Sequence, residues 1–235
     1  MSIKDIFPID KWDFNAQSIL ADLPPEDIQR LMARQHEQVY KKGEIIFREG
    51  SLPYSIYYIK HGKVKKYKID VDSSEQIIYV ANDGELLGYH AILADDRYPD
   101  SAATLEECTI IVIPKEDFLE TIAQSSVLSR RLLKTLSHEF TVFANSLTLF
   151  AQRPVRERLA LQLIVLREKY KENFEPGMDV TIGFTREDLA SLVGTARENV
   201  VRTLAEFRDA GILETKGTAI IIKDVKKLIA IANYK

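Results

Sequence analysis

The chain has 235 residues, of which 46% are hydrophobic and 29% charged, and its formal net charge is −3 at pH 7. This composition is typical of a folded globular protein and excludes a disordered chain or a generally basic nucleic-acid coat protein. The sequence contains no apolar run of bilayer-spanning length, and its amino end lacks the apolar segment of a signal peptide. We therefore expect a cytoplasmic protein without a membrane partner, folded into one large or two modest domains.

Charge is unevenly distributed along the chain. From Phe150 onward there are 15 basic and 12 acidic residues, whereas the preceding residues include 17 basic and 23 acidic ones. The mildly basic second part is therefore the better candidate for contact with nucleic acid, although so small an excess is a weak signal by itself.

In chain order, the first predicted element is an amphipathic helical segment over Ile19–Gln35, where Ile28 and Leu31 recur at helical spacing. Between Gln38 and Pro114 the pattern changes to short apolar or β-branched runs separated by turn residues. The predicted strands are Ile45–Phe47, Ser55–Ile59, Val64–Ile69, Gln76–Val80 and Thr109–Ile113. Many short strands with this regular spacing predict a β-sandwich or a rolled barrel.

A long helix is predicted to follow, from about Lys115 to Phe150. Apolar side chains recur along it at spacings of three and four residues and would form one continuous stripe. The stripe consists of Leu128, Leu132, Leu136, Phe140, Phe143, Leu147 and Phe150. Such a stripe packs either on the chain's own barrel or on a second subunit. Because it is longer than one small barrel would cover, we expect the side chains from Leu128 to Leu147 to form the interface of a homodimer.

The dipeptide Arg153-Pro154 is predicted to end this helix, because proline lacks a backbone donor and disfavours a helical residue before it. We therefore predict a sensor domain over residues 1–150, which includes the helix at about 115–150, and a second domain over residues 151–235. In the second domain, a helix over Val155–Tyr170 and a loop containing Pro176-Gly177 precede the final segment.

The segment Phe184–Asp209 has the pattern of a helix-turn-helix. Thr185 is a good N-cap for a first short helix, with Asp188 three residues later in the capping-box position. Gly194 suits a left-handed turn, and a second helix is predicted to begin near Arg197. Two short helices joined by a tight glycine turn are typical of a motif whose second helix enters the major groove of DNA.

The second helix and the residues after it strengthen this interpretation. Glu198 and Arg202 are four residues apart on one face of the helix, with Arg197 at its amino end. Arginine can bind guanine with a bidentate fork, and glutamate can accept from cytosine; the alternative is an ordinary surface ion pair between Glu198 and Arg202. Two further strands, Ile212–Glu214 and Ala219–Ile222, would form a hairpin wing. A helix-turn-helix with a wing predicts binding of double-stranded DNA much more strongly than either part alone.

These patterns together resemble the Crp/Fnr family of catabolite-activator-like transcription regulators over nearly the whole chain. The barrel is similar to the family's glycine-punctuated pattern at Gly43–Val64 and Asp83–Gly88, and the segment after the proline carries Arg158-Leu159-Ala160. The second helix matches the family's Arg-Glu-x-x-x-Arg. The resemblance implies an α+β fold: an amino-terminal β-roll of the cyclic-nucleotide-binding type, a long dimerisation helix and a carboxy-terminal winged helix-turn-helix.

The resemblance also implies partners and contact residues. A homodimer would bind an inverted repeat with half-sites like TGTGA and would contact RNA polymerase. Base contacts are implied for Arg197, Glu198 and Arg202, and phosphate contacts for Thr185, Arg186 and Thr195. Ala196 stands where the family usually has a capping serine, so the start of the second helix is expected to be less well fixed.

Family members that bind cyclic nucleotides hold the phosphate and ribose with a glycine-glutamate pair and an arginine followed by serine or threonine. Here Gly88 is followed by Tyr89, and the arginine-serine position is Asp100-Ser101. The long helix has Phe143 where those members have small hydroxyl residues. A buried phosphodiester needs a cationic fork and aligned donors, so we expect no binding of cyclic AMP. The barrel either binds an unknown small molecule near Gly88, Tyr89, Ser101 and Phe143 or has a purely structural role.

Other chemistry has less support in the sequence. The four histidines, His36, His61, His90 and His138, have no metal-binding spacing, so we expect no metal, no cofactor and no enzyme activity. The alternative, a cupin-like metal-dependent barrel enzyme with a carboxy-terminal interaction domain, would need convergent histidines and a carboxylate. The single cysteine, Cys108, excludes an internal disulfide and is either a buried inert thiol or an oxidation sensor.

Overall fold

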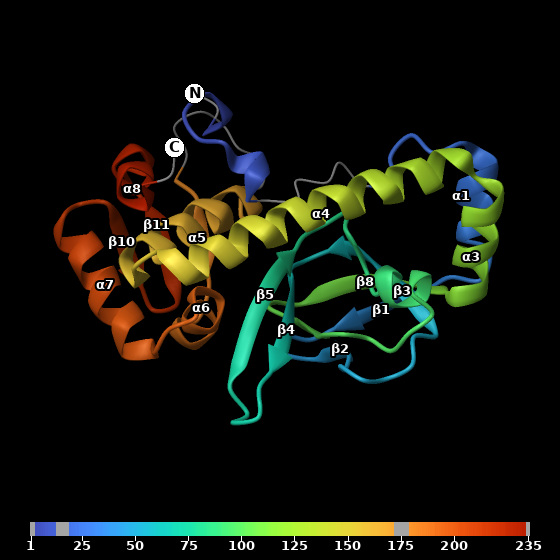
Figure 1. Cartoon of the computed structure of the whole chain (residues 1–235), viewed down its shortest axis with the longest axis horizontal. Helices are drawn as coiled ribbons and strands as arrows, with labels where there is room; N and C mark the ends of the chain where they lie inside the picture. The colour runs from blue at the N-terminus through green and yellow to red at the C-terminus, as the bar shows by residue number, and fades with distance from the viewer. Residues whose placement is uncertain (1–2, 13–18, 172–178, 234–235) are drawn as a thin grey trace. The chain divides into compact units, whose positions relative to one another are not determined.

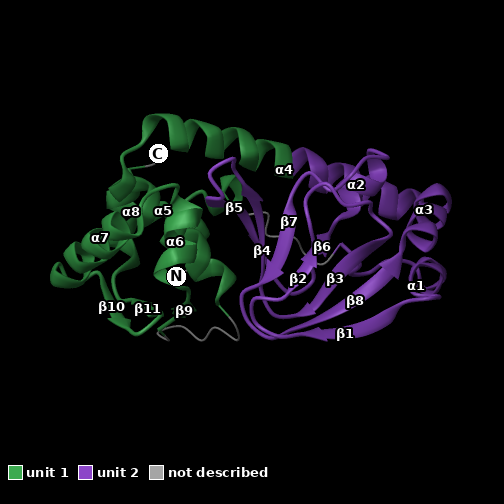
Figure 2. Cartoon of the chain, turned by 90° about the horizontal axis from the view of Figure 1, so that it is seen from below, with its two compact units in different colours: residues 1–14, 139–235 green, residues 15–138 purple. Residues whose placement is uncertain are grey.

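The computed structural model describes residues 3–12, 19–171 and 179–233, so the loop containing Pro176-Gly177 lies outside the described residues. The chain forms two compact units, residues 15–138 and residues 1–14 with 139–235 (Figure 2). Helix α4 (Ser126–Gln152), the long helix of Figure 1, contributes to both units and therefore has both colours in Figure 2. None of the helices in the described ranges combines the length and the apolarity that a membrane span requires.

The unit of residues 15–138 is built on two four-stranded antiparallel sheets. In one sheet the strand order is β1-β8-β3-β6, and in the other it is β2-β7-β4-β5. The strands are β1 (His36–Tyr40), β2 (Ile45–Phe47), β3 (Ser55–His61), β4 (Val64–Ile69), β5 (Glu75–Ala81), β6 (Leu86–Leu87), β7 (Ser101–Thr104) and β8 (Cys108–Pro114). The predicted sandwich, with its alternation of apolar runs and turn residues, is therefore confirmed.

The sequence pattern does not predict β1, β6 or β7, and each of these omissions has a physical reason. Strand β1 lies at the edge of its sheet and exposes all its residues except Tyr40, so it has no apolar periodicity. Strand β6 has only two residues. Strand β7 consists of small buried residues of which only Thr104 has strong β-propensity, and its pairing with β2 and β4 determines its conformation.

Two apolar clusters stabilise this unit. The inter-sheet cluster combines residues of both sheets, such as Ile59 and Val64. The helix-side cluster packs the other face of the first sheet, including Ile56, against the start of α4 and three helices. These helices are α1 (Pro25–Leu31), α2 (Tyr89–Leu93) and α3 (Lys115–Gln124). Leu128 and Leu132, which we expected at a dimer interface, belong to the helix-side cluster and are buried within their own unit.

Two helical predictions are wrong in extent. The segment Ile19–Gln35 contains only the short helix α1. The single helix expected from Lys115 to Phe150 is two helices, because Ser125 is extended, with φ −102° and ψ 102°. The Ser125 hydroxyl oxygen accepts a hydrogen bond from Leu128 N at 3.1 Å and so caps the start of α4.

The unit of residues 1–14 and 139–235 contains the predicted winged helix-turn-helix. Helix α4 ends at Gln152 and α5 begins at Val155, as Pro154 predicts. The elements besides α4 are η1 (Ile3–Asp5), η2 (Ile9–Lys11), α5 (Val155–Lys169), β9 (Thr181–Gly183), α6 (Arg186–Val193), α7 (Arg197–Asp209), β10 (Leu213–Lys216), β11 (Ala219–Ile222) and α8 (Val225–Ala232). The wing is a sheet in the order β10-β11-β9, which adds β9 to the predicted hairpin.

Candidate nucleic-acid interface

The helix-turn-helix forms through short-range contacts that its sequence predicts. Thr185 caps α6: its hydroxyl oxygen accepts from Asp188 N at 2.9 Å, and its hydroxyl donates to the Asp188 carboxylate at 2.6 Å. Helix α6 ends at Val193 and is capped by Gly194, whose φ of 69° and ψ of 54° define a left-handed conformation that favours glycine. The turn is therefore short, and α7 begins at Arg197.

Helix α7 has a buried face and an exposed face. The buried face includes Val200, Leu204 and Phe207. The three residues expected to contact bases, Arg197, Glu198 and Arg202, are all exposed. A helix that is anchored by apolar side chains on one face and presents charged groups on the other is suited to the major groove.

The two arginines of the exposed face have partners on the protein surface. Arg197 Nε forms an ion pair with the Glu187 carboxylate of α6. Arg202 Nη2 donates to Asn199 Oδ1 at 2.8 Å. Within the described residues Arg202 therefore pairs with Asn199, and not with Glu198 as a simple surface ion pair would require.

Arg186, expected to contact phosphate, links α6 to the wing. Its two Nη atoms donate to the carbonyl oxygens of Gly217 at 3.1 Å and Thr218 at 3.4 Å, in the turn between β10 and β11. Burial lowers the pKa of Arg186 from its ordinary value, but an arginine keeps its charge at neutral pH. Arg186 therefore places a positive charge where the wing meets the first helix of the motif.

Asn199 is a residue of this surface that the sequence analysis did not single out. Its side-chain nitrogen donates to Thr195 Oγ1 at 3.0 Å, and its oxygen accepts from Arg202. Ala196 is the N-cap of α7 and provides no side-chain cap, as expected. The sequence signal that could have indicated this role is a polar residue at the third helical position, following an N-cap whose side chain cannot accept a hydrogen bond.

Arg158 of α5 connects the end of α4 with the turn of the helix-turn-helix, all within one compact unit. Its Nη1 donates to Phe150 O at 3.3 Å and its Nη2 to Gly194 O at 3.0 Å. The guanidinium carbon also lies 5.7 Å from the centre of the Phe150 ring. A cation is favourable at the last carbonyl groups of a helix, so Arg158 stabilises the end of α4 and holds the turn before α7.

The residues expected to line an effector site have partners inside the protein. Gly88 has φ 78°, and a Cβ there would lie 2.9 Å from Tyr98 Cε1. Tyr89 is buried in the helix-side cluster, and Ser101 Oγ accepts from a backbone N–H of the segment after β2 at 2.9 Å. Phe143 lies on α4 in the other compact unit. Packing and backbone conformation are therefore sufficient reasons for glycine at position 88.

Asp100, which replaces the family's arginine, has its counter-charge inside the barrel. Its side chain is 5% exposed, and Oδ2 lies 3.0 Å from Lys66 Nζ and 3.8 Å from His90 Nε2. Burial and then the charge of Lys66 lower the pKa of His90 to about 4, so His90 is neutral at pH 7. The anion could be identified from the sequence, but its cation Lys66 on β4 could not, because it is distant along the chain.

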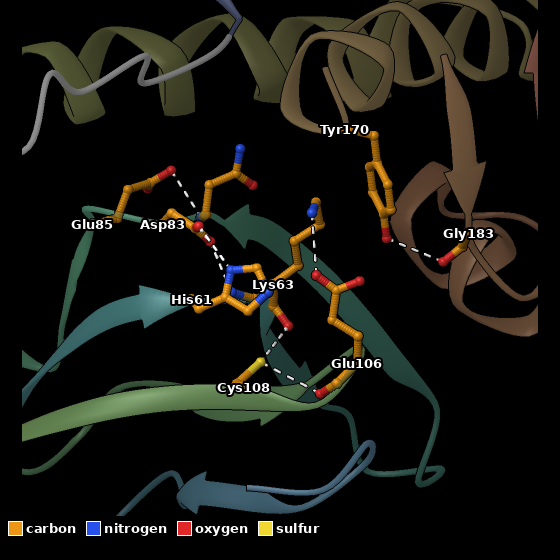
Figure 3. A network of polar contacts seen from close by, with 10 residues as sticks. His61, Lys63, Asp83, Glu85, Glu106, Cys108, Tyr170 and Gly183 are labelled. Atoms are coloured by element: carbon orange, nitrogen blue, oxygen red, sulfur yellow. Dashed lines mark hydrogen bonds and ion pairs between the residues drawn. The ribbon is translucent and has the colours of Figure 1, made fainter. Parts of the chain in front are cut away.

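A second polar network surrounds Cys108 (Figure 3). Cys108 Sγ lies 3.4 Å from the carbonyl oxygens of Lys63 and Glu106, and Lys63 Nζ lies 3.1 Å from Glu106 Oε1. Burial raises the pKa of Cys108 to about 11, which keeps the thiol protonated and favours the inert alternative. In the part of the chain that the structure describes, no three His, Cys, Asp or Glu residues are grouped to hold a metal ion.

Both regions of the chain match known domain families. Residues 37–125 match the cyclic nucleotide-binding domain, and residues 157–231 match the Crp-like helix-turn-helix domain. Together with the exposed face of α7, these matches define a DNA-binding transcription regulator that carries a domain of the cyclic-nucleotide-binding type.

Individual relatives agree with this class. The chain is 26% identical over 210 residues to the CRP-like cAMP-activated global transcriptional regulator of Mycobacterium tuberculosis, covering 89% of this chain and 94% of that protein. It is 28% identical over 192 residues to the transcriptional activator protein anr of Pseudomonas aeruginosa, covering 82% of this chain and 78% of that protein. The chain belongs to the Crp/Fnr family of transcription regulators, which are not enzymes, and the cupin-like alternative is set aside.

Solved structures of other proteins share the fold. The c-di-GMP responsive global regulator CLP of Xanthomonas campestris has a TM-score of 0.71 at 23% identity, with 85% of this chain and 99% of that chain covered. FixK2 from Bradyrhizobium japonicum has a TM-score of 0.72 at 19% identity, with 84% and 96% covered. The α+β prediction, a β-roll followed by helices and a carboxy-terminal helix-turn-helix, is confirmed.

Proposed function

We propose that the chain acts as a homodimer whose two α7 helices bind the half-sites of an inverted repeat in the major groove of DNA. The observation that carries this proposal is the exposed face of α7, where Arg197, Glu198 and Arg202 are free of the apolar core. Recognition helices about 34 Å apart in a two-fold dimer match half-sites one helical turn apart. Because the family regulates transcription, the proposal includes RNA polymerase as a partner and the cytoplasm as the location.

The proposed base contacts can be tested by selecting binding sites from a random-sequence DNA library. Arg202→Ala should lose about 1–3 kcal/mol per half-site and relax the preference at one guanine. Arg202→Lys should also lose discrimination, because an ammonium group cannot form the planar fork. Arg208→Ala is the control, since Arg208 lies in the last turn of the same helix and pairs with Asp209. Selection of the unchanged site by both Arg202 variants would contradict the proposal.

The exposed part of α4 supports the homodimer. Leu133, Phe140 and Leu147 are 68%, 75% and 73% exposed and recur every seven residues. This is the spacing of two-stranded coiled coils, and large apolar side chains exposed in a row favour burial against a second copy of the helix. The proposed interface therefore includes Leu133, which the sequence stripe did not contain, and excludes Leu128 and Leu132, which pack within their own unit.

Replacement of Phe140 and Leu147 by Glu tests the homodimer. The double variant should be monomeric in light scattering and should lose DNA binding, because one half-site alone binds weakly. Leu119→Glu is a matched control, since Leu119 is also exposed but lies on α3 outside the heptad. A wild-type chain that remained monomeric at micromolar concentration would exclude this interface.

We also propose that cyclic AMP is not the effector, although one relative is named as cAMP-activated. Asp100 stands at the position of the phosphate-binding arginine and forms a buried ion pair with Lys66. A phosphodiester there would have to separate this pair or remain beside an anion, and either arrangement is costly in a buried site. Calorimetry should show no binding of cyclic AMP at micromolar concentration, and Asp100→Arg alone should not restore it because Tyr89 replaces the family's glutamate. Micromolar binding to the wild type would refute this proposal.

A further inference from the structure

We propose that Asn199 is a positioning residue that couples a base contact of Arg202 to a phosphate contact of Thr195. The inference rests on the proposed function of α7. Asn199 is half-buried at the third position of the helix, with hydrogen bonds to a threonine just before the helix and to an arginine one turn further along. A single side-chain amide therefore joins two residues that would contact different parts of the DNA.

The chemistry of the two neighbours determines the orientation of the Asn199 amide. An arginine side chain has donors only, so Arg202 Nη2, at 2.8 Å, requires the amide oxygen on its side. The amide nitrogen then faces Thr195 and donates to Oγ1 at 3.0 Å. The opposite orientation would place the amide donors against the guanidinium donors, so the bond to Arg202 requires the orientation in which the amide nitrogen faces Thr195.

This orientation also determines what each neighbour can offer to DNA. Because Thr195 Oγ1 accepts from Asn199, the hydroxyl hydrogen is available to a phosphate oxygen, which can only accept. Arg202 uses one N–H for Asn199 and keeps the other donors of its guanidinium for a base. Holding the long arginine side chain in one conformation also reduces the entropy that it would lose on binding.

The missing cap of α7 gives the Asn199–Thr195 bond a second consequence. The side chain of Ala196 cannot accept a hydrogen bond from the first turn, so the usual side-chain link between N-cap and helix is absent. The bond from Asn199 to Thr195 instead connects the third helical residue to the residue before the N-cap. The start of the helix and the conformation of Arg202 therefore depend on the same side chain.

The test compares Asn199→Ala and Asn199→Leu in the full chain, with affinities measured for the selected site and for the site with one guanine replaced. Alanine and leucine both favour helix more than asparagine, and leucine also keeps a branched side chain in the half-buried space of the amide, so a loss common to both variants is not due to helix propensity or a cavity. Asn145→Ala is the matched control, because Asn145 lies on α4 and donates to the carbonyl of Lys11 at 2.9 Å. Thermal unfolding of each variant reports the contribution of helix stability separately.

In both Asn199 variants we expect the preference for the guanine that Arg202 recognises to fall roughly five- to tenfold. In an Arg202→Ala background the same substitutions should leave that preference unchanged, because the side chain that they position is absent. Thr195→Val should weaken binding to all sequences through the lost phosphate contact, with little change in salt dependence because a hydroxyl group neutralises no phosphate charge. It should also lower the guanine preference in part, because Asn199 loses the hydrogen bond to Thr195.

Two results would overturn the inference. One is an equal loss of affinity for all sequences in the Asn199 variants, which would indicate a role in helix stability only. The other is a loss of guanine preference that is additive with that of Arg202→Ala. If Arg202→Ala itself left the guanine preference unchanged, the proposed function of α7 would fail first, so the two failures can be distinguished.

Discussion

The two compact units contain polar networks of opposite character. In the barrel, Lys66 and Asp100 are buried with the cation and the anion 3.0 Å apart, and the half-buried His90 lies beside them. On α7, Asn199 and Arg202 form a neutral-to-charged hydrogen bond at the surface. Among the described residues, Arg202 has no anionic partner.

The difference separates charges that belong to a fold from charges that are available to a partner. A buried charge must be compensated within the protein, because its desolvation costs several kcal/mol. An exposed charge has no such requirement and can neutralise phosphates or bind bases. We therefore expect substitutions in the barrel network to change stability, and substitutions in the helix-turn-helix to change DNA binding.

The largest effect is expected for Lys66→Met, which leaves Asp100 buried without its cation. The free energy of unfolding should fall by about 3–5 kcal/mol in urea titrations, and Lys66→Met combined with Asp100→Leu should recover most of the loss. Lys68→Met is the control on the same strand, because the Lys68–Glu49 pair is exposed and should contribute less than about 1 kcal/mol. If the two lysine substitutions lowered the free energy of unfolding equally, the buried pair would contribute no more to stability than the exposed one, contrary to this prediction.

A smaller effect is expected from the protonation of His90. Its pKa is about 4 in the folded protein and about 6.5 when unfolded, so the unfolded state binds more protons between these values. The contribution of neutral His90 to the free energy of unfolding is fully present above pH 6.5 and is lost as the pH falls toward 4. At pH 5 this group should lower the free energy of unfolding by about 2 kcal/mol relative to pH 7.5.

His90→Gln should remove this part of the pH dependence in urea titrations at the two pH values. His61→Gln is the control, because the His61 side chain is 67% exposed beside Asp83. An unchanged pH dependence in the His90 variant would show that the buried network does not contain the titrating group.

In the other unit, Thr185→Ala should cost about 1 kcal/mol of stability, because it removes the N-cap of α6. Thr185→Ser keeps the hydroxyl group and should restore most of the loss. Thermal unfolding measures both variants, and the comparison with Lys66→Met shows how much less a surface cap contributes than a buried ion pair. Equal stability of the alanine and serine variants would argue against the capping role.

The smallest effect on stability is expected for Arg186→Ala, within about 0.5 kcal/mol, because Arg186 is only partly buried. Its effect on DNA should be larger. Binding to all sequences should weaken alike, and the slope of the affinity against salt concentration should fall by about one per half-site. A changed base preference with an unchanged salt slope would instead indicate that Arg186 acts by orienting the wing.

The winged helix-turn-helix could be predicted from the sequence because its signals act over a few residues. The cap at Thr185, the left-handed turn at Gly194 and the break at Pro154 each depend on neighbours along the chain. The strands with β-branched runs were predicted for the same reason. The cap of α4 at Ser125 is also local, but a single serine just before the apolar stripe is a weak signal for a helix break.

Only the tertiary structure decided which residues of a sequence pattern are buried, which are exposed and which form charge pairs. Leu128 and Phe140 belong to one apolar stripe, yet the first is buried in the helix-side cluster and the second is 75% exposed, because only the start of α4 belongs to that cluster. Lys66 compensates Asp100 because pairing of β4 with β7 brings two distant segments together. Strand β7 is extended because it pairs with both of its neighbours in the sheet, β2 and β4. The sequence determined the elements whose energy is local, whereas burial and charge pairing depend on contacts between residues far apart along the chain.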